Sequence, residues 1–316
     1  MKSEPQSSDL VERNSLETGK WANLAMAIAG VTAAYASHSD AILVDGLYSG
    51  VNFVSAIIAA RITASVIRPP NRAYPFGYDA YEALYVKYRS MILIGIMTFA
   101  IFGAVSKIIP YATGGDVPEL VFGPIVFYML AMVVTCFSLA AWHRHNWKKT
   151  GSRSELLQTE SRAAVVDGVI SAGAGCGLLA AALLRGTSLE FIVPVSDSIV
   201  VLLMSLAILP QPLKMFLGSL REVAGEAARG EIADRVTART REVLASRDAK
   251  IMDVAVMKMG RNFIVIVYLN PSDPYSANDV DVIRHELLAA FKEIIGDAKV
   301  EIILTAEDPY IGDAKM

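Results

Sequence analysis

The chain has 316 residues, of which 53% are hydrophobic and 19% are charged, and its mean hydropathy is +0.42. The apolar residues are gathered into long blocks, so the composition excludes an ordinary soluble enzyme and indicates an integral membrane protein. The formal net charge of -3 and the scattered basic residues argue against nucleic acid as a partner.

Six apolar segments are candidates for helices that cross a lipid bilayer. The hydrocarbon core is about 30 Å thick, and a helix that rises about 1.5 Å per residue needs about 20 residues to cross it. We expect Pro210 and Pro212 to break the last helix before a linker at 218–230. The sequence therefore predicts an α-helical membrane domain over residues 1–217, with spans at 21–37, 41–66, 84–109, 120–142, 163–184 and 191–216.

The distribution of basic residues predicts how these spans are oriented. Loops rich in Lys and Arg stay in the cytoplasm, and the loop at 37–40 has neither residue. The loops after the second and fourth spans contain Arg68, Arg72, Arg144, Lys148, Lys149 and Arg153. We therefore expect a multi-pass protein of a bacterial inner membrane whose N- and C-termini both face the cytoplasm.

The composition changes near residue 220, where charged residues become frequent and apolar residues fall into short runs. Helical spacing at 231–246 and after Ser276, and strand-like runs between and beyond them, predict the order helix, strand, strand, helix, strand. The two helices are expected at 231–246 and 276–295, and the three strands at 250–258, 263–269 and 300–304, with a turn at 260–262. Residues 218–316 are thus predicted to form a cytosolic α+β (αββαβ, ferredoxin-like) domain, small enough to gain from dimerising.

Two carboxylates lie deep inside apolar spans: Asp45 in the second and Asp167 in the fifth. A charge at membrane depth costs several kcal/mol, so an acid placed there is treated as a functional residue by default. The alternative is a structural acid that is satisfied by hydrogen bonds. Two such acids in one chain indicate a path for a cation.

Other oxygen-bearing side chains share the helix faces of these two acids. Ser49 and Asn52 follow Asp45 by four and seven residues, and Ser171 follows Asp167 by four. An all-oxygen set of ligands suits Mn²⁺ or Mg²⁺ better than Zn²⁺, with Fe²⁺ between them. The alternative for these three residues is close packing of membrane helices, which small and weakly polar side chains favour.

Four further residues carry charge or metal-binding capacity near the expected cytoplasmic ends of the helices. Lys87 and Arg89 in the third span are predicted to extend toward the interface. His143 and His145 are two residues apart and are expected to point in different directions, although a weak metal-capturing loop is an alternative.

Several local motifs, in this order, resemble the cation diffusion facilitator (cation efflux) family. The segment 39–49 reads SDAILVDGLYS, like the second helix of that family, and 76–78 reads FGY, like its phenylalanine-glycine-histidine segment. Asp167 falls at the spacing of the fifth-helix aspartate, and 194–197, PVSD, resembles the start of the sixth helix.

The resemblance implies a secondary transporter, not an enzyme, that exports a divalent metal cation in exchange for protons. The implied partners are the metal ion, protons, the lipid bilayer and a second copy of the chain, with the ion as cargo and no resident cofactor. The family site has two ligands four apart on each of two helices, but Ser49 and Ala163 stand where an acid and a histidine or acid are usual. The predicted ligands of Mn, Fe or Zn are Asp45, Asp167, Ser49, Asn52 and Ser171. The alternative is a degenerate member that acts as a non-transporting partner or regulatory subunit.

Overall fold

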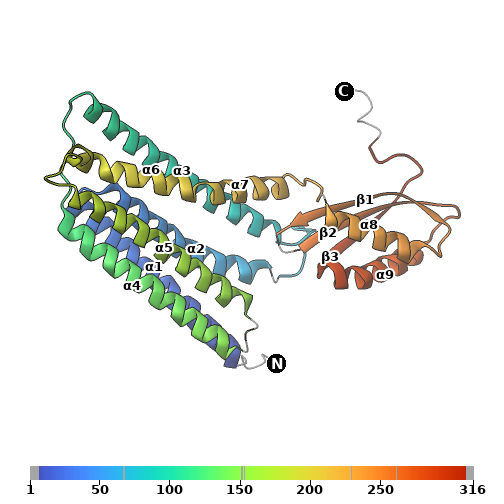
Figure 1. Ribbon diagram of the computed structural model, residues 1–316. Coiled ribbons are helices and arrows are strands. Elements are labelled where there is room, and N and C mark those ends of the chain that lie inside the picture. The colour runs from blue at the N-terminus through green and yellow to red at the C-terminus, as the bar shows by residue number, and fades with distance from the viewer. Residues whose placement is uncertain are drawn as a thin grey trace. The chain divides into compact units, whose positions relative to one another are not determined.

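The computed structural model describes residues 7–66, 68–150, 152, 154–228, 230–260 and 262–310 (Figure 1). The chain divides into two compact units. One unit contains the residues up to 58 together with 89–214, and the other contains 59–88 together with the residues from 215 onward. The predicted domain boundary between residues 217 and 218 stays a prediction. Arg153 and Arg261, which entered the predictions of orientation and of a turn, lie outside the described residues.

Long helices dominate the first unit, and three of them (α2, α3 and α7) continue into the second. Figure 1 shows α1, α4 and α5 running side by side, and α4 packs against both of the others. The elements are α1 (Ser7–Ser37), α2 (Asp40–Val66), α3 (Ala80–Ala112), α4 (Phe122–Lys149), α5 (Glu155–Leu183), the 3₁₀ turn η1 (Glu190–Val195), α6 (Ser196–Ile208) and α7 (Pro210–Val223).

Five helical segments in the described part of the chain are long and apolar enough to cross a membrane, rather than the six that were predicted. They are Asp40–Ile62, Ala80–Ala112, Phe122–Lys149, Leu156–Leu183 and Glu190–Val223. The predicted span at 21–37 forms the second half of α1, where Asn23, Thr32 and Ser37 interrupt a run of small alanines. These polar and small residues lower its hydropathy below that of the five segments above.

The break predicted near the end of the sixth span is confirmed. Helix α6 ends at Ile208 and α7 begins at Pro210, a position where proline is tolerated because the first helical residues lack an intrahelical acceptor. The predicted linker at 218–230 was partly wrong, since α7 continues to Val223.

One apolar core joins the helices of the first unit. Ile42, Met97, Ile125, Leu178 and Val201 are each at most 1% exposed and come from α2, α3, α4, α5 and α6 respectively. Helix α1 adds Met26 and Ala34 to the same cluster. The core therefore fixes the relative positions of all the helices that carry the candidate site.

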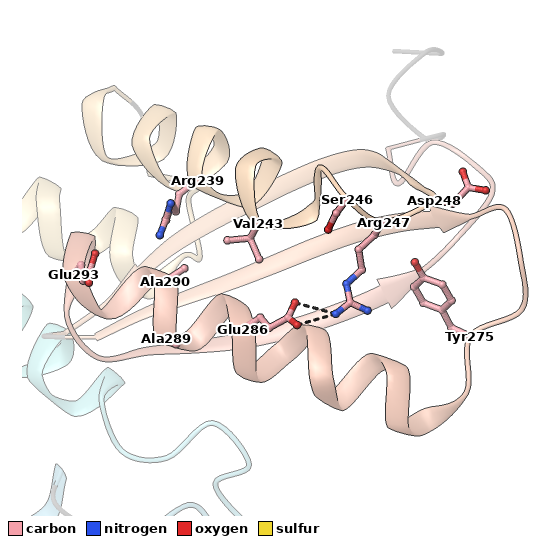
Figure 2. A pocket seen from close by; sticks show the side chains of 10 residues that line it. All are labelled: Arg239, Val243, Ser246, Arg247, Asp248, Tyr275, Glu286, Ala289, Ala290 and Glu293. Atoms are coloured by element: carbon pink, nitrogen blue, oxygen red, sulfur yellow. Dashed lines mark hydrogen bonds and ion pairs between the residues drawn. The ribbon is translucent and has the colours of Figure 1, made fainter.

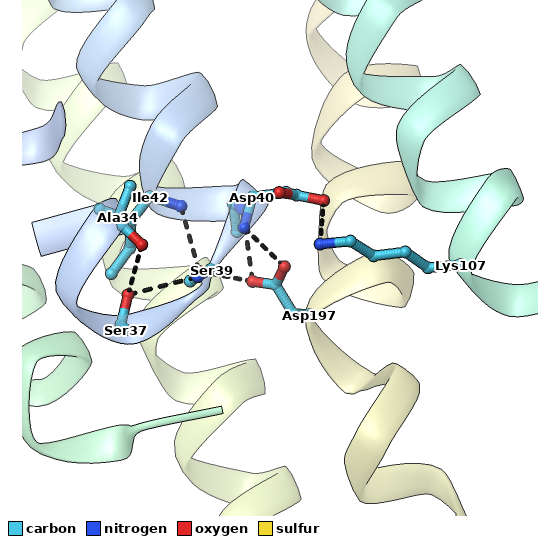
Figure 3. A network of polar contacts seen from close by, with 8 residues as sticks. Ala34, Ser37, Ser39, Asp40, Ile42, Lys107 and Asp197 are labelled. Atoms are coloured by element: carbon cyan, nitrogen blue, oxygen red, sulfur yellow. Dashed lines mark hydrogen bonds and ion pairs between the residues drawn. The ribbon is translucent and has the colours of Figure 1, made fainter. Parts of the chain in front are cut away.

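A polar network holds one end of α2 to α6 and α3 (Figure 3). The Asp197 carboxylate accepts hydrogen bonds from Ser39 Oγ at 2.5 Å and from the backbone N–H groups of Asp40 at 2.7 Å and Ala41 at 3.3 Å. Lys107 of α3 forms an ion pair with Asp40. Asp197 thus satisfies the free N–H groups at the start of α2, the role of a helix cap supplied by another helix.

The second unit contains the order helix, strand, strand, helix, strand that the sequence predicts. Its elements are α8 (Glu231–Leu244), β1 (Ala249–Met259), β2 (Asn262–Pro271), α9 (Ala277–Ile295) and β3 (Ala298–Leu304). Strands β1 and β2 pair antiparallel and β2 and β3 pair parallel, so α9 provides the crossover. Val236, Val265, Ile283, Leu287 and Phe291 are completely buried between the helices and the sheet.

Ser276 is the N-cap of α9, which confirms that prediction. Its side chain accepts a hydrogen bond from the backbone of Asp279, and the Asp279 carboxylate accepts from the Ser276 hydroxyl at 2.7 Å and backbone N–H at 2.8 Å. These hydrogen bonds hold the pKa of Asp279 below its ordinary value. The pair is a capping box that fixes where the helix begins.

The segment that contains the FGY motif is tied to the sheet of the same unit. Lys299 of β3 donates to an Asp79 carboxylate oxygen at 2.5 Å and also to the backbone carbonyl of Phe76. Asn262 of β2 donates to the other Asp79 oxygen at 2.9 Å. Asp79 is buried, so the loop between α2 and α3 is held by a satisfied charge and not by apolar contacts alone.

Candidate metal centre

Helix α2 presents three of the predicted ligands along one face. Asp45, Ser49 and Asn52 occur at intervals of four and three residues within Asp40–Val66, so successive turns of the helix place them above one another. Ser49 is 3% exposed, which shows that this face points into the bundle. The helical spacing expected from the sequence is present in α2, whereas binding of a metal ion by these residues stays a prediction.

The Asp45 carboxylate is held by donors from two other helices. Tyr128 of α4 donates its hydroxyl to Asp45 Oδ2 at 2.8 Å, and Ser171 of α5 donates to Oδ1 at 3.2 Å. Together these two hydrogen bonds fix the orientation of the Asp45 carboxyl group. Three helices thus meet at Asp45.

Asp167 of α5 lies within electrostatic range of Asp45, and also of Glu160 and Arg89. Glu160 precedes Asp167 by seven residues on the same face of α5. The structure therefore brings the two acids from the second and fifth spans into one region. Ionised carboxylates within electrostatic range of each other in an apolar bundle repel, and a cation relieves that repulsion.

Asn52 does not face an open position. Its side-chain oxygen accepts a hydrogen bond at 2.9 Å from a terminal nitrogen of Arg89, on α3. The prediction that Arg89 extends toward the interface was wrong, because the side chain turns into the bundle toward Asn52. Arg89 Nε is buried, and within the described part of the chain it has no hydrogen-bond partner, an arrangement that costs about 1–3 kcal/mol.

The side-chain atoms in this region that could bind a metal ion are almost all oxygen. Within the described residues, no group of three or more His, Cys, Asp or Glu side chains has the arrangement of a metal site. A cation held here would take Asp45 and Asp167 as its charged ligands. The remaining ligands would be hydroxyl, amide or water oxygens, for which Ser49 and Ser171 are candidates, whereas Asn52 already accepts a hydrogen bond from Arg89.

His143 belongs to a separate buried network. Its Nδ1 lies 2.9 Å from Ser15 Oγ, and Asn146 donates to the same hydroxyl at 3.1 Å. His143 is 1% exposed whereas His145 is exposed, so the two histidines point in different directions as predicted. His143 therefore packs α4 against α1 and is not part of a metal-capturing loop.

A groove of about 830 Å³ lies between α8 and α9 in the second unit (Figure 2). Its charged side chains include Arg247, which donates to both carboxylate oxygens of Glu286 at 2.8 and 2.9 Å. Arg239 donates to Glu242 at 2.8 Å. Within the described residues, the acids of this groove do not form a group of three or more that could hold a metal ion.

The family of the chain follows from a comparison with family models. The model described as the cation efflux transmembrane domain matches residues 19–223, which is well over half of the chain. The chain belongs to the cation efflux family. The resemblance to cation diffusion facilitators is thereby confirmed, and a search of curated proteins found no match.

Membership gives this cation efflux protein its general role. It is an integral membrane protein that transports metal cations, and the family consists of transporters and not of enzymes. The matched region includes α1 through α7 apart from the first turns of α1, and hence all of the residues described around Asp45 and Asp167.

Reasoning from the sequence missed Tyr128 and assigned Arg89 to the interface instead of to this region. Tyr128 is one aromatic residue among many in an apolar helix, and nothing in the sequence indicates that it meets Asp45. Arg89 gave a clear signal, because it lies nine residues inside α3. A charged side chain at that depth in an apolar helix is treated as a functional residue by default, as Asp45 is.

Proposed function

We propose that this cation efflux protein is a secondary transporter that exports a divalent metal cation in exchange for protons. The observation that carries the proposal is that Asp45 of α2 accepts a hydrogen bond from Ser171, one helical turn after Asp167 on α5, so the two acids lie in one region of the bundle. Two carboxylates match the charge of one divalent ion, so binding neutralises the region.

Exchange for protons follows from the chemistry of the same oxygens. A carboxylate oxygen that binds a metal ion cannot at the same time hold a proton, so the two cations compete for one site. A site that alternates between metal and protons needs no further proton-binding group. Asp45 and Asp167 are proposed to serve both cations.

The proposed ligands favour hard cations. Asp45, Asp167, Ser49, Asn52 and Ser171 all offer oxygen, whereas zinc prefers nitrogen or sulfur in at least part of its shell. The cargo is proposed to be Mn²⁺, Fe²⁺ or Zn²⁺, with Mn²⁺ best matched to this chemistry. Competition among Mn²⁺, Fe²⁺, Zn²⁺, Co²⁺ and Mg²⁺ for uptake into vesicles would rank them.

The direct test is metal flux in vesicles that contain the purified protein. Asp45→Ala and Asp167→Ala should each abolish the flux, because each removes half of the charge that binds the ion. Glu119→Ala, in a described segment outside the helices, is a matched control that removes an acid elsewhere and should leave the flux unchanged. Unchanged flux in both aspartate variants would refute the proposed site.

A second candidate is a family member that does not transport and acts as a partner or regulatory subunit. Ser49 and Ala163 favour it, since they stand where the resemblance leads us to expect ligands. Metal-dependent proton movement by the purified protein alone would exclude this candidate. Absence of such movement, together with metal transport by a complex with a related protein, would support it.

The membrane arrangement is part of the proposal. We infer that α1 crosses the bilayer as a sixth span, because its Met26 and Ala34 belong to the same core as the five apolar helices. Both termini would then lie in the cytoplasm of a bacterium, and the αββαβ domain would support a homodimer. A membrane-impermeant thiol reagent should label a cysteine placed at Asn71 from the inside and one placed at Ser188 from the outside.

A further inference from the structure

Arg89 places a permanent positive charge beside the proposed cation site. It lies on α3, donates to Asn52 of α2 at 2.9 Å, and is within electrostatic range of Asp167 and Glu160 of α5. An arginine keeps its charge under all conditions that proteins meet. The region therefore contains a cation of its own before any metal ion enters.

Packing alone does not account for this arginine. A hydrogen bond between α2 and α3 could be made by a neutral side chain, without bringing a full charge into the bundle. Arg89 Nε is buried and, among the described residues, lacks a hydrogen-bond partner, so the guanidinium is not fully satisfied by Asn52. Its remaining stabilisation comes from the carboxylates of α5, which lie within electrostatic range.

We propose that Arg89 acts as the resident counter-cation of the transport site. This inference rests on the proposed function. When neither a metal ion nor protons are bound, the guanidinium offsets negative charge on Asp167 and Glu160. An arriving metal ion takes over Asp167 as its partner and is repelled by the guanidinium, so the site binds the ion less tightly than its carboxylates alone would.

Weaker binding serves a transporter. A site with several uncompensated carboxylates would hold a divalent ion long enough to slow its release, whereas a nearby fixed cation shortens that time. The guanidinium cannot leave the protein, so it takes up its position beside Asp167 again when the ion departs. Arg89 thus lowers affinity and raises turnover.

The test is the initial rate of Mn²⁺ and of Zn²⁺ uptake into vesicles as a function of ion concentration. Arg89→Gln should lower the KM by about tenfold, the order expected when a unit charge is removed from a partly buried site, and should also lower kcat. Arg89→Lys keeps the charge and should stay near the wild type. If Arg89→Gln does not fold, Arg89→Met removes the same charge and keeps the long stem.

Lys87→Gln is the matched control. It removes one positive charge from the same helix two residues away, on a different face, and should leave the KM unchanged. A KM for Arg89→Gln equal to that of the wild type would overturn the inference. Equal losses of flux in Arg89→Gln and Arg89→Lys without a lower KM would also overturn it, because the side chain would then act through its shape. Absence of any metal flux in the wild type would overturn both this inference and the proposed function, an outcome distinct from the other two.

Discussion

The hydroxyl of Tyr128 lies 2.8 Å from Oδ2 of Asp45 and donates a hydrogen bond to it. The two residues come from α4 and α2 and are 83 positions apart in the chain. The bond fixes the direction of the Asp45 carboxyl group, while Ser171 donates to its other oxygen. Groups that hold a metal ligand in place are commonly worth 10–100-fold in affinity or activity.

Tyr128→Phe should therefore reduce metal flux by about tenfold without abolishing it. The variant removes the hydroxyl and keeps the ring, so helix packing is preserved. The measurement is the concentration dependence of Mn²⁺ uptake into vesicles. Tyr111→Phe is the control, because its hydroxyl bonds the backbone of Phe191 and does not reach Asp45. Wild-type flux in Tyr128→Phe would show that Asp45 does not need this donor.

Gly30 should not tolerate even one added methyl group. A Cβ on Gly30 would lie 2.5 Å from the Cα of Gly46 on α2 and 2.9 Å from the hydroxyl of Tyr128. Gly30→Ala must therefore push α1 away from α2 and displace the donor to Asp45. We expect a lower melting temperature in detergent and a loss of metal flux.

Gly95→Ala provides the comparison for this substitution. A Cβ at Gly95 of α3 would meet nothing within 4 Å, so Gly95→Ala should change neither the melting temperature nor the metal flux. If both alanine variants behaved like the wild type, the close approach of α1 and α2 would be contradicted.

His143→Ala should destabilise the pairing of α1 with α4 by roughly 2–4 kcal/mol, because it leaves a cavity and removes the partner of a buried hydroxyl. The three tryptophans, Trp21, Trp142 and Trp147, lie on these two helices, so the melting curve of tryptophan fluorescence reports on this contact. His145→Ala, next to it but exposed, should leave the melting curve unchanged. A loss of metal affinity without a loss of stability would assign His143 to metal binding instead.

Local patterns predicted local structure well. The order of elements after residue 230 and the cap at Ser276 depend on nearby residues, and the structure has both. The faces shared by Asp45 and Ser49 also follow from helical periodicity. The contacts between side chains of different helices could not be predicted, because no spacing within α4 indicates that Tyr128 meets Asp45. Arg89 was misinterpreted because its direction depends on Asn52, 37 residues earlier.

Ser276→Ala should loosen the start of α9, since loss of an N-cap costs about 1 kcal/mol. Hydrogen exchange of the α9 amides, followed by mass spectrometry on the full-length protein, should become about fivefold faster in the first turn. Unchanged exchange would mean that Ser276 contributes nothing to the helix.

The stability of the same turn should depend on pH through Asp279, and Asp279→Asn should remove that dependence. The pKa of Asp279 is lowered by its hydrogen bonds. Its carboxylate therefore stabilises the folded helix at pH values above the ordinary pKa of about 3.9. That contribution is lost as the pH falls through the lowered pKa. The variant should therefore show less protection than the wild type at pH 7, and the difference should shrink under strongly acidic conditions. A difference that is the same at every pH would contradict the assignment.

The most direct measurement of the central claim is a double-mutant cycle for Mn²⁺ binding by the purified protein at equilibrium. If Asp45 and Asp167 bind the same ion, Asp45→Asn and Asp167→Asn should each remove most of the binding, and the double variant should lose little more than either one. Losses that add in the double variant, or wild-type affinity in either single variant, would contradict a shared site.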